Sequence, residues 1–70
     1  FINRGITHKE LKDFGRALAD YNKAIELEPN SQDGYTNRGT LYLEIGNRDA
    51  AIRDFDTIVK RMAKRSQKLL

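Results

Sequence analysis

The chain offers few side chains that could do chemistry, since it has one histidine and no cysteine. His8 is the only candidate general base near neutral pH. No Ser, Thr or Asp stands beside it in a recognisable catalytic arrangement, so we expect His8 to pack between helices. A single histidine excludes an all-histidine metal site. The absence of cysteine excludes thiolate metal sites, redox motifs and cysteine nucleophiles.

The densest acidic cluster is formed by Asp49, Asp54 and Asp56. Asp49 precedes Arg53 by four residues and Asp56 precedes Lys60 by four, which is the spacing of ion pairs on a helix surface. A solvated helix face therefore explains the cluster better than a metal site or a glycosidase carboxylate pair. The chain contains no EF-hand loop, HExxH, P-loop or GxGxxG motif. We expect no enzymatic activity and no cofactor.

The composition allows one small domain or a piece of a larger one, with 70 residues, 33% charged and 39% hydrophobic. No apolar run is long enough for membrane insertion. The absence of cysteine slightly favours the cytoplasm over an oxidising compartment but leaves the localisation open.

The net charge of +3 combines two unlike regions: residues 1–56 hold eight Lys/Arg and ten Asp/Glu, and residues 57–70 hold five Lys/Arg and no acid. Five cations without an aromatic platform indicate a solvated helix end, so we expect no nucleic acid partner. A basic surface for nucleic acid or membrane is the alternative, which predicts steep salt dependence of binding.

A repeat of 34 residues runs through the chain and aligns residues 3–5 with residues 37–39, which are Asn-Arg-Gly in both places. Such a period is typical of stacked structural units that cannot bury their apolar faces alone. Two units should be marginally stable. The other matches are Glu10 with Glu44, Ala17 with Ala51, Asp20 with Asp54, Phe1 with Tyr35, Leu11 with Ile45, Leu18 with Ile52, Tyr21 with Phe55 and Ile25 with Val59.

Apolar residues at steps of three and four predict helices, and nothing predicts a strand. One helix should run from Phe14 to about Glu28, where Pro29 ends it. In the second unit the Gly-Asn pair at residues 46–47 predicts a turn, after which Asp49 can start a helix. Lys12 occupies the place of Gly46 in the first unit, with Asp13 and Gly15 near by to accommodate the bend. The expected fold class is all-α, with four helices in antiparallel helix-turn-helix repeats.

We expect the last helix to continue from about Asp49 to Leu70, since no Gly, Pro or Asn marks a break. A separate capping helix after Ala63 is the alternative. The continuing apolar stripe consists of Ile58, Val59, Met62, Ser66, Leu69 and Leu70.

The spacing resembles the tetratricopeptide repeat, whose pattern is W-x2-L-G-x2-Y, A-x3-F and P. This resemblance implies an α-solenoid with a first repeat over residues 1–30, a second over residues 31–63, and a basic helical extension over residues 64–70. Phe1 falls inside the family's first helix, so the chain looks like a fragment. The matching residues are Phe1, Arg4, Gly5, His8, Ala17, Tyr21 and Pro29 in the first repeat, and Tyr35, Arg38, Gly39, Tyr42, Ala51 and Phe55 in the second, where Ala63 replaces the proline.

The resemblance also implies a concave groove, lined by the first helix of each repeat, that binds an extended peptide or a partner helix. Asn3 and Asn37 are its strongest candidates, because an asparagine amide can hold both an N–H and a C=O of a peptide backbone. The predicted lining is Ile2, Asn3, Ile6, Lys9 and Glu10 from the first repeat and Asp33, Thr36, Asn37, Thr40, Leu43 and Glu44 from the second.

Some members of this family bind a C-terminal carboxylate through lysines, arginines and asparagines. Asn37 matches one position of that clamp, but Ile2 and Ile6 replace the lysine and asparagine that it needs in the first repeat. An apolar peptide or an amphipathic helix suits this groove better.

A protein-interaction module is therefore the first functional prediction. The alternative is a self-association element that forms a homodimer through its long last helix, using Met62, Ser66, Leu69 and Leu70.

Overall fold

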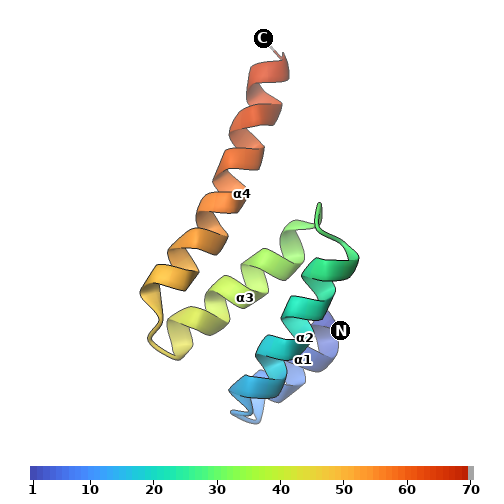
Figure 1. The fold of residues 1–70 in the computed structure, drawn as a ribbon, viewed down its shortest axis with the longest axis vertical. Coiled ribbons are helices and arrows are strands. Elements are labelled where there is room, and N and C mark those ends of the chain that lie inside the picture. The colour runs from blue at the N-terminus through green and yellow to red at the C-terminus, as the bar shows by residue number, and fades with distance from the viewer. Residues whose placement is uncertain (70) are drawn as a thin grey trace.

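The computed structural model describes the backbone of residues 1–69 and the side chains of residues 1–64, and this part of the chain forms four helices. They pack as two antiparallel hairpins, α1 with α2 and α3 with α4, and the two hairpins join through α2 and α3 (Figure 1). The all-α prediction is confirmed, and so is the extended last helix, which continues past Ala63. The helices are α1 (Ile2–Glu10), α2 (Phe14–Leu27), α3 (Gln32–Glu44) and α4 (Arg48–Leu69).

Short polar side chains begin the helices where the sequence breaks its apolar pattern. The Ser31 hydroxyl accepts a hydrogen bond from the Asp33 N–H at 3.3 Å and starts α3. The Asn47 amide oxygen accepts one from the Ala50 N–H at 3.2 Å, so α4 begins at Arg48, one residue before the predicted start. Both caps satisfy N–H groups that have no partner inside the helix.

The two hairpin turns use the same backbone conformation with different residues. Gly46 has φ of +84° and Lys12, its counterpart, has φ of +62°. Asp13 ends this turn, as predicted, by accepting a hydrogen bond from the Arg16 N–H at 3.3 Å and capping α2. The prediction for Gly15 was wrong, because Gly15 lies within α2 and Lys12 itself adopts the left-handed conformation. A side chain with a Cβ is strained there, so the first turn is less favourable than the second.

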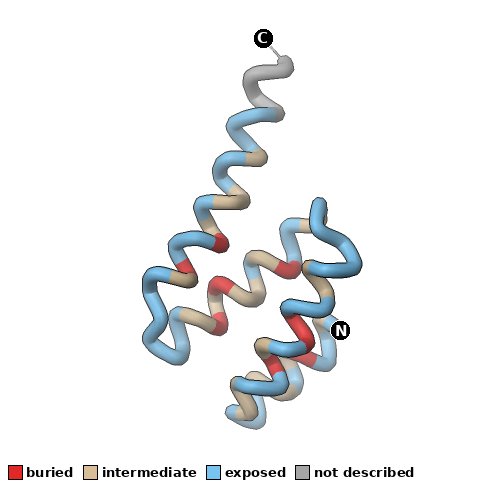
Figure 2. Tube along the Cα trace, viewed as in Figure 1, coloured by how far each residue is buried: buried red, intermediate tan, exposed pale blue. Residues whose placement is uncertain are grey.

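Each hairpin closes where a glycine of one helix faces an aromatic ring of the next. A Cβ added at Gly5 would lie 2.6 Å from the Tyr21 ring, and one added at Gly39 would lie 2.9 Å from the Phe55 ring. Tyr21 is completely buried, as are Ala17, Leu41 and Ala51 (Figure 2). The close approach predicted from the small residues is confirmed, and it allows the rings to fill the space beside the glycines.

A third glycine joins the two hairpins. A Cβ at Gly34 of α3 would lie 2.7 Å from Cγ1 of Ile25 on α2. Nothing in the 34-residue repeat marks this position, because its counterpart would precede Phe1. The sequence therefore indicated the contacts within each hairpin but not this contact between them.

The second half of α4 extends away from the rest of the fold (Figure 1). In the part of the chain that the structure describes, α4 packs against α3 alone. Ile52, Val59 and Met62 are 63%, 60% and 54% exposed. The side chains of Ser66, Leu69 and Leu70, which we predicted for self-association, lie outside the described residues.

Replacing Gly5 or Gly39 by alanine should destabilise the fold by roughly 1–3 kcal/mol, because the new methyl group forces the facing ring out of its site. Gly15→Ala is the matched control. Nothing lies within 4 Å of a Cβ at Gly15, so this change should stabilise α2 by about 0.5–1 kcal/mol. Urea unfolding followed by circular dichroism measures all three. Equal effects at Gly5 and Gly15 would contradict the close-contact explanation.

Candidate functional site

The predicted groove lies on α1 and α3, which contact each other directly. Lys9 Nζ on α1 lies 3.7 Å from Glu44 Oε1 on α3, so the structure brings together these two candidates from different repeats. Ile2 and Ile6 are partly buried and pack against the core cluster of Ala17, Tyr21 and Leu41. The two isoleucines therefore support the fold beneath this face.

The polar groove residues differ in how free they are to bind. The Asn37 amide donates one hydrogen bond to the Asp33 carbonyl at 2.8 Å, which leaves its second N–H and its oxygen available. The Thr40 hydroxyl donates to the Thr36 carbonyl at 2.9 Å. Asn3 is exposed, and its side chain makes no hydrogen bond among the described residues. Of the two amides, Asn3 therefore has more hydrogen-bonding groups available for a partner.

The remaining groove candidates are accessible. Glu10, Asp33, Thr36 and Leu43 are exposed, and Glu44 is exposed beside Lys9. Leu43 is 51% exposed, which places an apolar side chain at the surface of α3.

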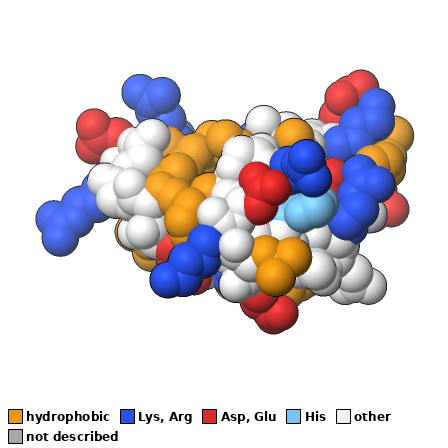
Figure 3. Space-filling view, turned by 90° about the horizontal axis from the view of Figure 1, so that it is seen from below, with side chains coloured by type: hydrophobic (Ala, Val, Ile, Leu, Met, Phe, Trp, Pro, Cys, Tyr) orange, Lys and Arg blue, Asp and Glu red, His pale blue; other side chains and the backbone are white. Residues whose placement is uncertain are grey.

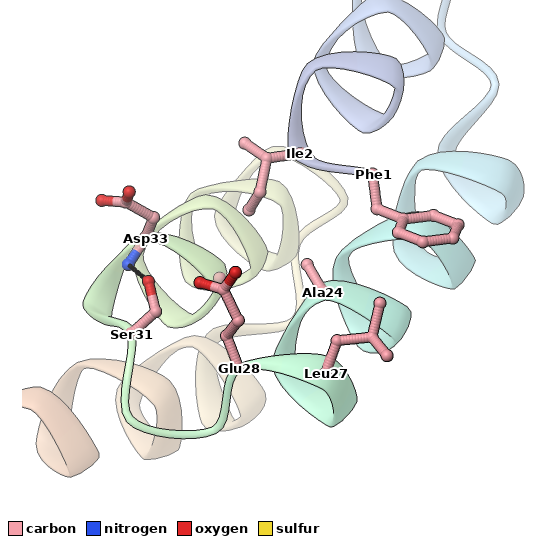
Figure 4. A pocket seen from close by; sticks show the side chains of 8 residues that line it. Phe1, Ile2, Ala24, Leu27, Glu28, Ser31 and Asp33 are labelled. Atoms are coloured by element: carbon pink, nitrogen blue, oxygen red, sulfur yellow. Dashed lines mark hydrogen bonds between the residues drawn. The ribbon is translucent and has the colours of Figure 1, made fainter.

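A pocket of about 150 Å³ opens where the first turn of α1, the end of α2 and the start of α3 meet (Figure 4). Its apolar wall includes Phe1, Ala24 and Leu27, and the carboxylates of Glu28 and Asp33 lie at its side (Figure 4). Ile2 and Asp33 belong to the predicted groove, but the other members were missed. The apolar spacing around Ala24 and Leu27 predicts only that they lie on one face of a helix. It could not predict the pocket, because the other lining residues come from two other helices. The complete lining is Phe1, Ile2, Ala24, Leu27, Glu28, Ser31, Asp33 and Gly34.

One bidentate ion pair connects the two helices of each hairpin, and neither pair was predicted from the sequence. Arg4 donates to Asp20 through Nε at 3.0 Å and Nη2 at 2.7 Å. Arg38 donates to Asp54 in the same way, at 2.9 Å and 2.6 Å. Both members of the pair recur at an offset of 34 residues, and this signal could have identified them.

The interpretation of Asp54 as part of a solvated acidic face was wrong. Asp54 is only 3% exposed, since Arg38 reaches it from α3. Asp56 does form the predicted ion pair with Lys60, at 3.0 Å. The other predicted ion pair, between Asp49 and Arg53, does not form among the described residues.

His8 lies between the helices, with Nε2 3.7 Å from Asp20 Oδ2. Charged side chains of both signs surround the histidine on this face of the molecule (Figure 3). Burial raises the pKa of the Tyr21 hydroxyl, so this group stays protonated near neutral pH.

Within the described part of the chain, no group of three His, Cys, Asp or Glu side chains is placed to hold a metal ion. No helix there is long and apolar enough to cross a bilayer.

The Arg4 guanidinium holds the pKa of Asp20 below its usual range, chiefly through its hydrogen bonds and against the opposing effect of burial. A carboxyl group with a lowered pKa stabilises the fold above its unfolded pKa of about 3.9, and this contribution is lost as the pH falls through the folded value.

The native chain should therefore lose stability in acid below about pH 4. Asp20→Asn and Arg4→Met should each reduce the slope of unfolding free energy against pH in that range, since each removes one side of the pair. Urea unfolding at several pH values between 6 and 2.5 measures the slopes. An unchanged slope in both variants would contradict the role given to Arg4.

Comparison with known families and proteins agrees with this geometry. Two models of the tetratricopeptide repeat match the chain, one over residues 1–31 and one over residues 20–53. No solved structure matches the chain.

Several curated proteins are similar to this chain over most of its length. Hsp70-Hsp90 organizing protein 3 of Arabidopsis thaliana is 46% identical over 50 residues, which are 71% of this chain and 9% of that protein. Serine/threonine-protein phosphatase T of Aspergillus oryzae is 39% identical over 61 residues, 87% of this chain and 13% of the phosphatase. Serine/threonine-protein phosphatase 5 of Homo sapiens is 36% identical over 58 residues, 83% of this chain and 12% of the phosphatase. The chain thus spans about a tenth of the length of these relatives. Its match to the two repeat models and its similarity to these proteins show that it belongs to the tetratricopeptide repeat family.

Proposed function

We propose that this chain is a protein-interaction module that binds a peptide segment or a partner helix on the face formed by α1 and α3, without catalysis. The observation that carries this proposal is that α1 and α3 contact each other, and each of these helices carries an asparagine, Asn3 or Asn37, with unused hydrogen-bonding groups. Such amides can bind a peptide backbone whatever its side chains are.

Charge decides which peptide the groove prefers. The predicted lining contains one cation, Lys9, and three acids, Glu10, Asp33 and Glu44, a net charge of −2. Lys9 already lies beside Glu44. An acidic C-terminal tail would meet repulsion here, whereas a basic or neutral apolar segment would be attracted. The packing of Ile2 and Ile6 against the core also supports a groove without a carboxylate clamp.

The pocket at the end of the groove provides an anchor point. Its wall of Phe1, Ala24 and Leu27 suits an apolar side chain, and Glu28 and Asp33 suit a lysine or arginine next to that side chain. Ile2 and Asp33 line both the pocket and the predicted groove, so one peptide can occupy both.

The relatives support a protein partner. One is named for organizing Hsp70 and Hsp90, and others are named as phosphatases, but each match covers about a tenth of the relative's length. We therefore propose for this chain only the binding role of its repeats. The repeat boundaries that we propose are residues 1–30 and 31–63, with a basic helical extension over residues 64–70.

Three fluorescent 12-residue peptides test the groove, each with the same apolar centre and with lysine, glutamine or glutamate on both sides. The lysine peptide should bind tightest and the glutamate peptide weakest. Asn3→Ala with Asn37→Ala should weaken binding of the lysine peptide roughly tenfold, since two hydrogen bonds are lost.

Asn30→Ala is the matched control, because Asn30 lies on the turn between α2 and α3, outside the groove and the pocket lining. Circular dichroism checks that helix content is unchanged. The same affinity in the double variant and the control, or tightest binding of the glutamate peptide, would contradict the proposal.

A second candidate function is self-association through α4. The exposure of Val59 and Met62 on this helix favours it, because apolar side chains of this size gain stability when covered. Ser66, Leu69 and Leu70 complete the predicted surface.

A further inference from the structure

One hydroxyl group in the core has no hydrogen-bond partner. The Tyr21 side chain is completely buried, and its hydroxyl bonds to nothing among the residues that the structure describes. A buried polar group without a partner opposes folding. The second repeat shows that the fold does not need this hydroxyl, because Phe55 fills the equivalent place against Gly39. Tyr21 therefore carries a polar group that packing does not explain.

The Tyr21 hydroxyl lies beneath one end of the face formed by α1 and α3. The ring lies against Gly5 of α1. Burial raises the pKa of the hydroxyl, and the negative charges of Glu44, Asp20 and Glu10 raise it further. Glu10 is the last residue of α1 and Glu44 is the last residue of α3, and both belong to the predicted groove. The buried hydroxyl is therefore close to two carboxylates of the groove.

These two groove carboxylates have unused hydrogen-bonding capacity. Arg4 donates to both oxygens of Asp20, so that third carboxylate is occupied. Lys9 Nζ lies 3.7 Å from Glu44 Oε1, which is too far for a hydrogen bond. Glu10 is exposed and forms no ion pair among the described residues. This end of the groove thus combines a hydroxyl and two carboxylates that receive no hydrogen bond.

Cations on the neighbouring turns do not supply the missing donor. Lys12 lies on the turn between α1 and α2, and Arg48 begins α4 after the second turn. Within the described part of the chain, neither of them forms an ion pair with Glu10 or Glu44. The site therefore lacks a directional N–H donor even though positive charge is near.

We infer that an arginine side chain of the partner binds at this end of the groove, takes the place of the Lys9 ammonium beside Glu44, and donates a hydrogen bond to the Tyr21 hydroxyl oxygen. A guanidinium carries five N–H groups in a planar fork, so a single side chain can serve a carboxylate and the hydroxyl together. Lys9 follows Gly5 by four residues and lies on the same face of α1, so displacing its side chain uncovers the Tyr21 ring on that side. This inference rests on the proposed function and names the partner side chain at one end of the groove.

The variant Tyr21→Phe tests the role of the hydroxyl. The probes are two of the fluorescent 12-residue peptides with the same apolar centre, one carrying arginine on both sides and one carrying norleucine. Tyr21→Phe should weaken binding of the arginine peptide about five- to tenfold and change that of the norleucine peptide less than about twofold. Tyr42→Phe is the matched control, since it removes a hydroxyl from α3 outside the predicted groove lining and should leave both affinities unchanged.

The variant Lys9→Met tests the exchange of cations at Glu44. Methionine keeps a long side chain and removes the competing ammonium, so affinity for the arginine peptide should rise about threefold or more. Lys23→Met is the matched control, because Lys23 forms a similar ion pair with Glu26 on α2, at 3.5 Å and outside the groove. It removes the same net charge and should not raise the affinity. Weaker binding of the arginine peptide by Lys9→Met would contradict the exchange.

Urea unfolding separates a binding role of the hydroxyl from a structural role. The urea midpoint of Tyr21→Phe should equal or exceed that of the native chain, since the change removes an unpaired buried hydroxyl. A clear fall in the midpoint would show that the hydroxyl has a partner within the fold, and it would overturn the inference.

The peptide results distinguish failure of this inference from failure of the groove itself. Equal weakening of the arginine and norleucine peptides by Tyr21→Phe would overturn the role of the hydroxyl and keep the groove proposal. Failure of both peptides to bind the native chain would overturn both.

Discussion

The fold depends on the distance at which paired helices pack. At Gly5 and Gly39 the space that a Cβ would occupy is taken by the rings of Tyr21 and Phe55, so each hairpin closes only because these two positions lack a side chain. The rings in turn need that space, since Tyr21 is completely buried. Each glycine and the ring that faces it therefore form a single contact. This contact occurs twice, with the same separation along the sequence between Gly5 and Tyr21 as between Gly39 and Phe55.

The close packing of the helices also allows ion pairs to form between them. With the helices this near, Arg4 and Arg38 reach Asp20 and Asp54 in bidentate pairs. The carboxylates of both pairs are buried. The contact of α1 with α3 then follows from stacking one hairpin on the other.

Much of this fold could be predicted from the sequence because its contacts repeat. A match between residues 34 positions apart identified the glycines, the aromatic rings and the helix faces together. Contacts that occur once could not be found this way: Gly34 against Ile25, the left-handed Lys12, and the pocket built from three helices. Asn3 and Asn37 were predicted as binding residues only through resemblance to a family, since a helix surface residue carries no local signal of binding.

Asp54 shows why spacing along one helix can mislead. Its neighbours predicted a solvated acidic face, but its partner is Arg38 on another helix. The repeated Arg and Asp, 16 residues apart in both units, held the correct information. A repeat thus predicts contacts between helices better than periodicity within one helix does.

The most direct test of the central interaction is a double-mutant cycle between Gly5→Ala and Tyr21→Leu, followed by urea unfolding. If the methyl group and the ring compete for one space, Gly5→Ala should cost at least about 1 kcal/mol less in the Tyr21→Leu background than in the native chain. If the two costs add to within about 0.5 kcal/mol, the glycine and the ring act independently, and the account of how each hairpin closes is contradicted.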